Sequence, residues 1–131
     1  MSRPLRILIS AGEASGDRLG AGLARAIRAV RPDVVLSGMG GEEMEQAGVR
    51  LVQHASEVAV VGVVEVIRHL PAIRLAMRRL ERAIRDERPD LVVPIDFPDF
   101  NLRLAARAKG AGVPVVYYVS PQVWAWRRGR V

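Results

Sequence analysis

The sequence has no cysteine and no apolar run long enough to cross a membrane, and we expect no signal peptide. The absence of cysteine excludes disulfide scaffolds and thiolate metal sites, and it fits a reducing compartment. The longest apolar stretch, residues 58–67, is interrupted by Glu65 and falls well short of the ~20 residues that span a bilayer. The first residues lack the apolar segment and the small-residue cleavage site of a signal peptide.

Acidic residues are also in the minority, because 20 basic residues face 14 acidic ones and the net charge is +6. All the basic residues except Lys109 are arginine. This charge suits anionic partners such as nucleotides, phosphosugars, lipid headgroups or nucleic acid, although an ordinary arginine-rich surface explains it equally well. Half of the 131 residues are apolar, which excludes a disordered chain and predicts a single domain with one real core.

Strand-like and helix-like segments alternate along the chain. Most of the strand-like runs are nearly continuous in Val, Ile and Leu, which is typical of strands buried on both faces of a parallel sheet. The junctions Arg31-Pro32-Asp33 and Arg88-Pro89-Asp90 each end a basic helix and begin a strand. We therefore expect an α/β fold, a Rossmann-like doubly wound parallel sheet, with strands at 5–10, 34–37, 49–52, 91–95 and 113–119 and helices at 17–30, 42–47, 71–87 and 100–109.

Four unusual loops follow expected strands, at residues 11–17, 38–41, 96–101 and 120–126. Ligands of open parallel sheets bind beyond the carboxyl ends of the strands, so these loops are expected to meet at one crevice. In the first loop, Gly12 and Gly16 allow close backbone approach, whereas Glu13 and Asp17 weaken a phosphate site and favour sugar hydroxyls. The alternative is structural: Ser15 or Asp17 caps the first helix.

Asp96 ends an apolar strand, where burial raises the pKa of a carboxyl group and where the group can reach a bound hydroxyl. The alternative is that Asp96 or Asp99 caps the helix that begins near Phe100. Asp99 is better placed to be that cap, which leaves Asp96 without a structural role and favours a catalytic one.

Two other features allow more than one interpretation. The apolar stretch at residues 58–67 is either a core element or an exposed patch that docks on an anionic membrane or holds acyl chains. The patch would comprise Val58, Val60, Val61, Val63, Val64, Val66 and Ile67. Trp124 and Trp126, beside arginines, could stack on a base or lie at a membrane interface, but they are too few to indicate nucleic acid. His54 and His69 have no partner at metal-ligand spacing, so no metal site is expected.

Four motifs, in order, resemble those of lipid-A-disaccharide synthases: AGEASGD at 11–17, VGVVEV at 61–66, IDFPDFN at 95–101 and YVSPQVWAW at 118–126. The resemblance implies a GT-B glycosyltransferase with two Rossmann-like domains, working by inversion without metal or other cofactor. Its substrates would be UDP-2,3-diacylglucosamine and 2,3-diacylglucosamine 1-phosphate (lipid X), joined at the cytoplasmic face of the bacterial inner membrane with release of UDP. It implies no nucleic-acid partner and leaves the oligomeric state open.

The same resemblance assigns roles to residues of this chain. Asp96 would be the general base that deprotonates the 6-hydroxyl of the acceptor. Glu13 and Ser15 would contact sugar or acceptor beside Gly12 and Gly16, in a cleft also lined by Asp99, Asn101, Ser120 and Gln122. Gln122 stands where other members carry serine, so its role is open.

The chain is much shorter than members of that family. We therefore expect residues 1–131 to form the N-terminal, acceptor-side domain, which is inactive without the C-terminal domain that grips the nucleotide. Two other functions compete: a nucleotide-binding Rossmann module and a non-catalytic membrane-docking domain. The first lacks G-x-G-x-x-G and has Ser37-Gly38 where an acidic residue would end the second strand.

Overall fold

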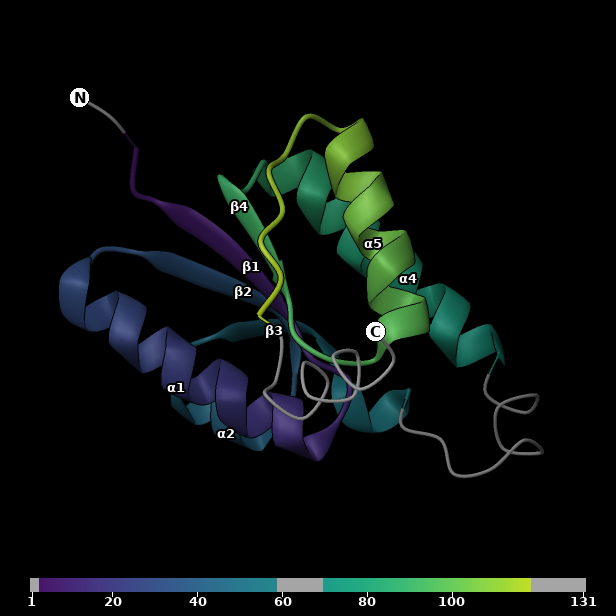
Figure 1. Cartoon of the computed structure of the whole chain (residues 1–131), viewed down its shortest axis with the longest axis horizontal. Helices are drawn as coiled ribbons and strands as arrows, with labels where there is room; N and C mark the ends of the chain where they lie inside the picture. Colours follow the sequence, from purple (N-terminus) through teal and green to yellow (C-terminus); the bar gives the residue numbers. More distant parts are fainter. Residues whose placement is uncertain (1–2, 59–69, 119–131) are drawn as a thin grey trace, which may run out of the picture.

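The computed structural model describes residues 3–58 and 70–118. Its core is a parallel sheet of four strands in the order β3-β2-β1-β4 (Figure 1). The strands are β1 (Arg6–Ser10), β2 (Val35–Gly40), β3 (Arg50–His54) and β4 (Leu91–Pro94). The helices are α1 (Ala14–Val30), α2 (Glu42–Gln46), the 3-10 turn η1 (Ala55–Glu57), α4 (Leu70–Glu87) and α5 (Pro98–Gly110). The expected α/β class is confirmed.

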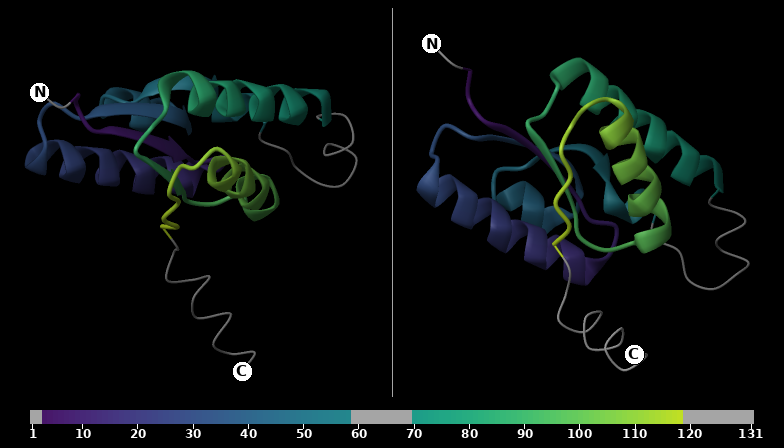
Figure 2. Two further views of the ribbon diagram at one scale, coloured as in Figure 1. Left: turned by 90° about the horizontal axis from the view of Figure 1, so that it is seen from above. Right: turned by 45° about the horizontal axis from the view of Figure 1, so that its top comes forward.

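The chain winds away from β1 in one direction and then crosses back to its other side. β1 pairs in parallel with β2 on one edge and with β4 on the other, so the strand order reverses between β1 and β4. The helices α1 and α2 lie on one face of the sheet, and α4 and α5 lie on the opposite face (Figure 2). This reversal is the point at which open α/β sheets bind their ligands.

Each face of the sheet carries its own hydrophobic core, because alternate residues of a strand point to opposite faces. Leu8 and Val92 pack with α4 and α5, whereas Ile7, Ile9 and Val93 pack with α1 and α2. This double burial is the physical reason why the strands are almost wholly apolar in sequence.

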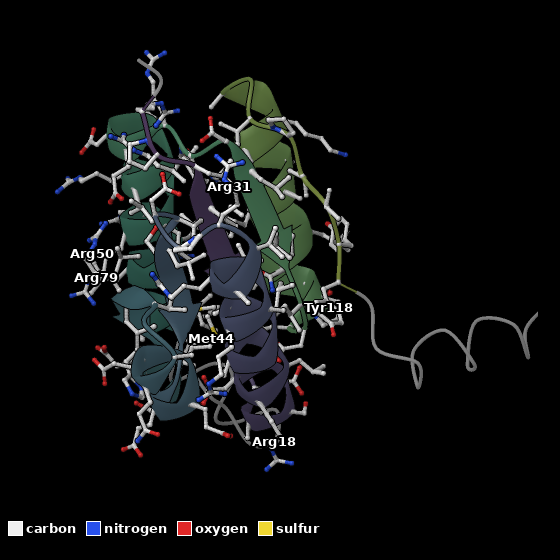
Figure 3. All side chains as sticks on the ribbon, turned by 90° about the vertical axis from the view of Figure 1, so that its left-hand side faces the viewer. Arg18, Arg31, Met44, Arg50, Arg79 and Tyr118 are labelled. Atoms are coloured by element: carbon white, nitrogen blue, oxygen red, sulfur yellow. The ribbon has the colours of Figure 1, made fainter. Side chains whose placement is uncertain are left out.

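Met44 of α2 shows how tightly the second core is packed. Its side chain is fully buried, and an added Cβ at Gly20 or Gly40 would lie within 2.7 and 2.3 Å of its sulfur. Figure 3 shows Met44 in the interior of the molecule, while Arg18 and Arg50 point away from it.

The expected strand at 113–119 is only partly formed within the described residues. Val92 accepts from Val116 N and donates to the carbonyl of Pro114, both at 3.0 Å, and Val115 makes an isolated bridge to Val92. Prolines explain the gap, since neither Pro94 nor Pro114 has an N–H to donate to a ladder. Residues 114–118 thus run beside β4 without completing a regular strand.

The helices α1 and α5 begin two or three residues earlier than expected. α1 begins at Ala14 rather than Asp17, and α5 begins at Pro98 rather than Phe100. Proline is well suited to the first turn of a helix, because its missing N–H has no partner there. In the described part of the chain, no helix is long and apolar enough to span a bilayer.

Candidate functional site

A hollow of about 610 Å³ lies at the carboxyl edge of the sheet, where the loops after all four strands converge. Its volume is within the usual range for small-molecule sites, about 300–1,000 Å³. The expected convergence of the loops at 11–17, 38–41 and 96–101 is confirmed, because Gly12, Gly41 and Phe97 all line the hollow. The loop after β3 lines it as well. The lining residues are Gly12, Glu13, Ala14, Asp17, Gly41, His54, Ala55, Ser56, Val58 and Phe97.

Asp96 joins β4 to α5 and is partly buried at this edge. One carboxylate oxygen accepts from Gly12 N at 2.6 Å and the other from Glu13 N at 3.1 Å. The expectation that Asp96 has no structural role is therefore wrong, since it holds the β1–α1 loop against the β4–α5 loop. Sequence patterns reveal caps only a few residues away, and these donors are more than 80 positions distant.

The pKa of Asp96 lies above the ordinary value for aspartate, chiefly because burial penalises the charged carboxylate. The hydrogen bond from Gly12 N opposes this shift, and the negative charge of Glu13 adds to it. A carboxylate of raised pKa is a better proton acceptor than a free one, which suits a general base.

Gly16 gives Asp96 its place over the first turn of α1. A Cβ at Gly16 would lie 1.7 Å from a carboxylate oxygen of Asp96. At Gly12, an added Cβ would lie 2.5 Å from the ring of Phe97. The close approach predicted for both glycines is thus made by the chain's own β4–α5 loop.

Glu13 makes two hydrogen bonds to the β4–α5 loop, one through its side chain and one through its backbone. Its carboxylate accepts from Phe97 N at 3.1 Å, while its own N–H binds Asp96. Phe97 precedes α5 with a left-handed backbone, φ 52°, and no side chain caps α5 locally. The prediction that Asp99 is this cap is wrong, because Pro98 begins the helix and puts exposed Asp99 inside its first turn.

Asp17 has a different partner from the one expected. It is 8% exposed, and its carboxylate accepts from Gly41 N at 2.8 Å, Met44 N at 3.0 Å and Glu43 N at 3.1 Å. Asp17 therefore caps α2 from a neighbouring helix. Neither Asp17 nor Ser15 caps α1, which begins after Glu13 without a side-chain cap; Ser15 is exposed on the first turn.

Asn101 lies beneath Asp96 and is only 1% exposed. Its amide nitrogen donates to the carbonyl of Ser10 at 3.1 Å and to the carbonyl of Asp96. The hydroxyl of Ser10 donates to its amide oxygen at 2.7 Å. Asn101 is thus a buried support of the hollow and is not among the residues that line it.

A groove of about 600 Å³ lies between α4 and α5, beside the hollow. Phe97 lines both spaces and stacks on Phe100, with ring centroids 5.4 Å apart. The groove has an apolar floor of Leu70, Ile73, Met77, Phe97 and Phe100, and charged walls of Arg74, Arg78, Arg103, Arg107, Glu81 and Asp99.

Sequence reasoning missed the contribution of the loop after β3. His54 and Ser56 line the hollow, and His54 Nδ1 accepts from Ser56 N at 3.2 Å. No short sequence pattern identifies these two residues as part of the site, because the other loops that line the hollow are distant in sequence. Residues 58–67 were expected to be either a core element or an exposed patch, and Val58 agrees with the first alternative, because it is fully buried in the core against α4 and α5.

Several predicted residues lie outside the described residues: Ser120, Gln122, Val60, Val61, Val63, Val64, Val66 and Ile67. Within the part that is described, no cluster of three or more His, Cys, Asp or Glu side chains could hold a metal ion.

The sequence is similar to a family of known enzymes. The family model for lipid-A-disaccharide synthetase matches residues 7–131. Lipid-A-disaccharide synthases of Trichlorobacter lovleyi and Myxococcus xanthus are 50% and 51% identical to it over 131 residues. Those residues are the whole chain but 34% of each relative, so the chain spans about a third of their length.

Solved structures also resemble the fold. A glycotransferase of kitacinnamycin gives a TM-score of 0.62 at 17% identity, covering 90% of this chain and 31% of that one. MurG of Acinetobacter baumannii gives 0.57 at 14% identity, covering 88% and 34%. At these identities the likeness shows the fold alone, and it agrees with the expected α/β fold with a parallel sheet.

Proposed function

Because this chain belongs to the lipid-A-disaccharide synthetase family, we propose that it is the acceptor-side, N-terminal domain of a lipid A glycosyltransferase. The reaction would transfer 2,3-diacylglucosamine from UDP-2,3-diacylglucosamine to the 6-hydroxyl of lipid X, giving the β(1→6) disaccharide 1-phosphate and UDP. The observation that supports this assignment is the partly buried carboxylate of Asp96 beside the hollow at the strand-order reversal.

In the proposed mechanism, Asp96 accepts the proton of the acceptor hydroxyl as its oxygen attacks the anomeric carbon of the donor. The bond from that carbon to the UDP oxygen breaks, UDP leaves with the electron pair, and a single displacement inverts the centre. Only ionised Asp96 can act, so turnover should fall as the pH drops through its raised pKa. That acid limb would lie at higher pH than for an unperturbed aspartate.

In this proposal, residues 1–131 supply only part of the active site. We assign the grip on the nucleotide to a C-terminal domain, in line with the share of the relatives that this chain spans. In that arrangement residues 1–131 bind the acceptor and hold the base, but they do not turn over alone.

A chimaera tests this function: this chain replaces the matching third of the Myxococcus xanthus enzyme. Asp96→Asn should lower disaccharide formation from the two purified substrates by about 10²–10⁴-fold, the usual contribution of a general base. Asp33→Asn, an exposed aspartate at the α1–β2 junction, is the matched control and should leave turnover unchanged. Less than a tenfold loss in Asp96→Asn would refute the base assignment. Turnover by the isolated chain would refute the two-domain division.

We also propose that the protein is cytoplasmic and docks as a peripheral protein on the anionic inner face of the inner membrane. The groove between α4 and α5 supports this, because its apolar floor suits acyl chains and its arginines suit phosphate headgroups. Glu81 already pairs with Arg107 at 3.3 Å, so we assign the headgroup contacts to Arg74 and Arg103.

Co-sedimentation with vesicles tests the docking. The chain should bind phosphatidylglycerol vesicles better than phosphatidylcholine vesicles, and binding should weaken with salt. Replacing Arg74 and Arg103 by Gln should reduce binding about thirtyfold, at ~1 kcal/mol per basic residue near the surface. The pair Arg25→Gln and Arg31→Gln, on the opposite face, is the control. Equal losses in both pairs, or tighter binding to duplex DNA, would contradict a lipid-facing groove.

A further inference from the structure

We propose that Glu13 is a positioning residue, whose carboxylate holds the backbone of Phe97 and thereby fixes Asp96 at the hollow. This inference rests on the proposed function only in taking Asp96 to be the base. It gives Glu13 a role within the protein, in place of the contact with sugar that the sequence resemblance implies.

The first support is a reciprocal clamp between two loops. Gly12 N and Glu13 N donate to the two carboxylate oxygens of Asp96, at 2.6 and 3.1 Å. In return, Phe97 N donates to the carboxylate of Glu13 at 3.1 Å. Each loop thus supplies a carboxylate to the backbone of the other. The peptide group between Asp96 and Phe97 is held at its N–H by Glu13 and at its carbonyl by the amide of Asn101.

The second support is the backbone of Phe97. A residue other than glycine with φ near +50° is strained by about 1–2 kcal/mol, so the surroundings must hold it there. No local side chain caps α5, and the acceptor for the N–H of Phe97 is the carboxylate of Glu13. The ring of Phe97 is meanwhile wedged against Gly12 and stacked on Phe100. Removing the carboxylate of Glu13 would release the hydrogen bond that the strained conformation depends on.

Two substitutions of Glu13 separate the effect of its hydrogen bond to Phe97 from the effect of its negative charge on Asp96. Glu13 raises the pKa of Asp96 through its negative charge, after the larger effect of burial. Among residues 3–58 and 70–118, the other ionisable groups facing the hollow are Asp17, engaged with α2, and His54 at the end of β3; Asp99 follows on α5. Glu13→Gln keeps an oxygen that can accept from Phe97 N and removes the charge. Glu13→Ala removes both.

The first experiment measures the clamp in this chain, without any turnover. Amide hydrogen exchange at Phe97 should be at least about tenfold faster in Glu13→Ala and nearly unchanged in Glu13→Gln, since a lost hydrogen bond opens the site. In an NMR titration of ¹³C-labelled aspartate carboxyls, Glu13→Gln should lower the pKa of Asp96. Glu45→Gln, an exposed glutamate of α2, is the matched control and should change neither value. Unchanged exchange at Phe97 in Glu13→Ala would overturn the proposal.

The second experiment measures kcat and KM in the chimaera. Glu13→Ala should lower kcat about tenfold or more with KM for lipid X within about twofold, because a displaced base affects the chemical step and leaves substrate binding intact. Glu13→Gln should restore most of kcat and move the acid limb of the pH profile to lower pH. A rise in the KM for lipid X at unchanged kcat would show that Glu13 binds substrate instead, and it too would overturn the proposal.

The two proposals fail separately. If Asp96→Asn keeps its turnover, the base assignment fails, yet the exchange of Phe97 still reports whether Glu13 holds the loop. If amide exchange at Phe97 is unchanged in Glu13→Ala, the positioning role fails, while Asp96 remains testable as the base.

Discussion

The carboxylates of Asp17 and Asp96 both accept hydrogen bonds from backbone N–H groups of a distant segment. They differ in how fully they are buried and hydrogen-bonded. Asp17 is 8% exposed and accepts three such bonds from the start of α2. Asp96 is only partly buried and accepts two, from Gly12 and Glu13. The pKa of Asp96 is raised by burial.

The difference separates a carboxylate that stabilises the fold from one that can also do chemistry. The three donors of Asp17 belong to one short helix, so its bonds substitute for a missing cap. Asp96 lies between two loops at the edge of the ligand hollow and is less deeply buried than Asp17. We expect substitutions of Asp17 to lower stability, and those around Asp96 to lower turnover.

The largest effect on stability should come from Asp17→Ala. It removes the cap of α2 and leaves buried N–H groups at Gly41 and Met44 without an acceptor. We expect the free energy of unfolding to fall by about 2 kcal/mol, as for loss of a buried cap. Urea denaturation of the chain measures this, with Asp33→Ala as the exposed control. A loss under about 0.5 kcal/mol would remove the contrast with Asp96.

Gly16→Ala tests the other half of the comparison. The new Cβ would displace the Asp96 carboxylate from its place 1.7 Å away, so transfer by the chimaera should fall about tenfold to a hundredfold. Gly22→Ala is the matched control, because it lies in the same helix and its Cβ would meet nothing within 4 Å. This control should keep full turnover and gain about 0.5–1 kcal/mol of stability. Equal turnover in the two variants would show that the position of Asp96 is not critical.

Sequence reasoning succeeded where the determining interactions are local or periodic. The apolar strands follow from burial on both faces, and the Pro-Asp junctions mark the ends of α1 and α4 correctly. The convergence of loops at the carboxyl edge follows from the parallel sheet alone. Asp96 was located by the same rule, together with the resemblance of its motif.

It failed where one side chain serves a distant backbone. Asp17 caps a helix that begins 25 residues later, whereas local sequence rules consider it only as a cap of its own helix, α1. The same limitation left Asp96 without an assigned structural partner. It also left Asn101 on the wall of the cleft rather than beneath it. These pairings depend on how β1, β2 and β4 are laid side by side, which no short window of sequence contains.

The smallest effect is expected at Ser10, which supports Asp96 from behind. Ser10→Ala removes the hydroxyl that donates to Asn101 Oδ1 at 2.7 Å, leaving a buried acceptor unpaired. The free energy of unfolding should fall by about 1 kcal/mol. Turnover of the chimaera should fall only a few-fold, because Asn101 still donates to the carbonyls of Ser10 and Asp96. A loss of turnover as large as in Gly16→Ala would mean that Asp96 is positioned mainly from the buried side, and that the clamp of Gly12, Glu13 and Phe97 is secondary.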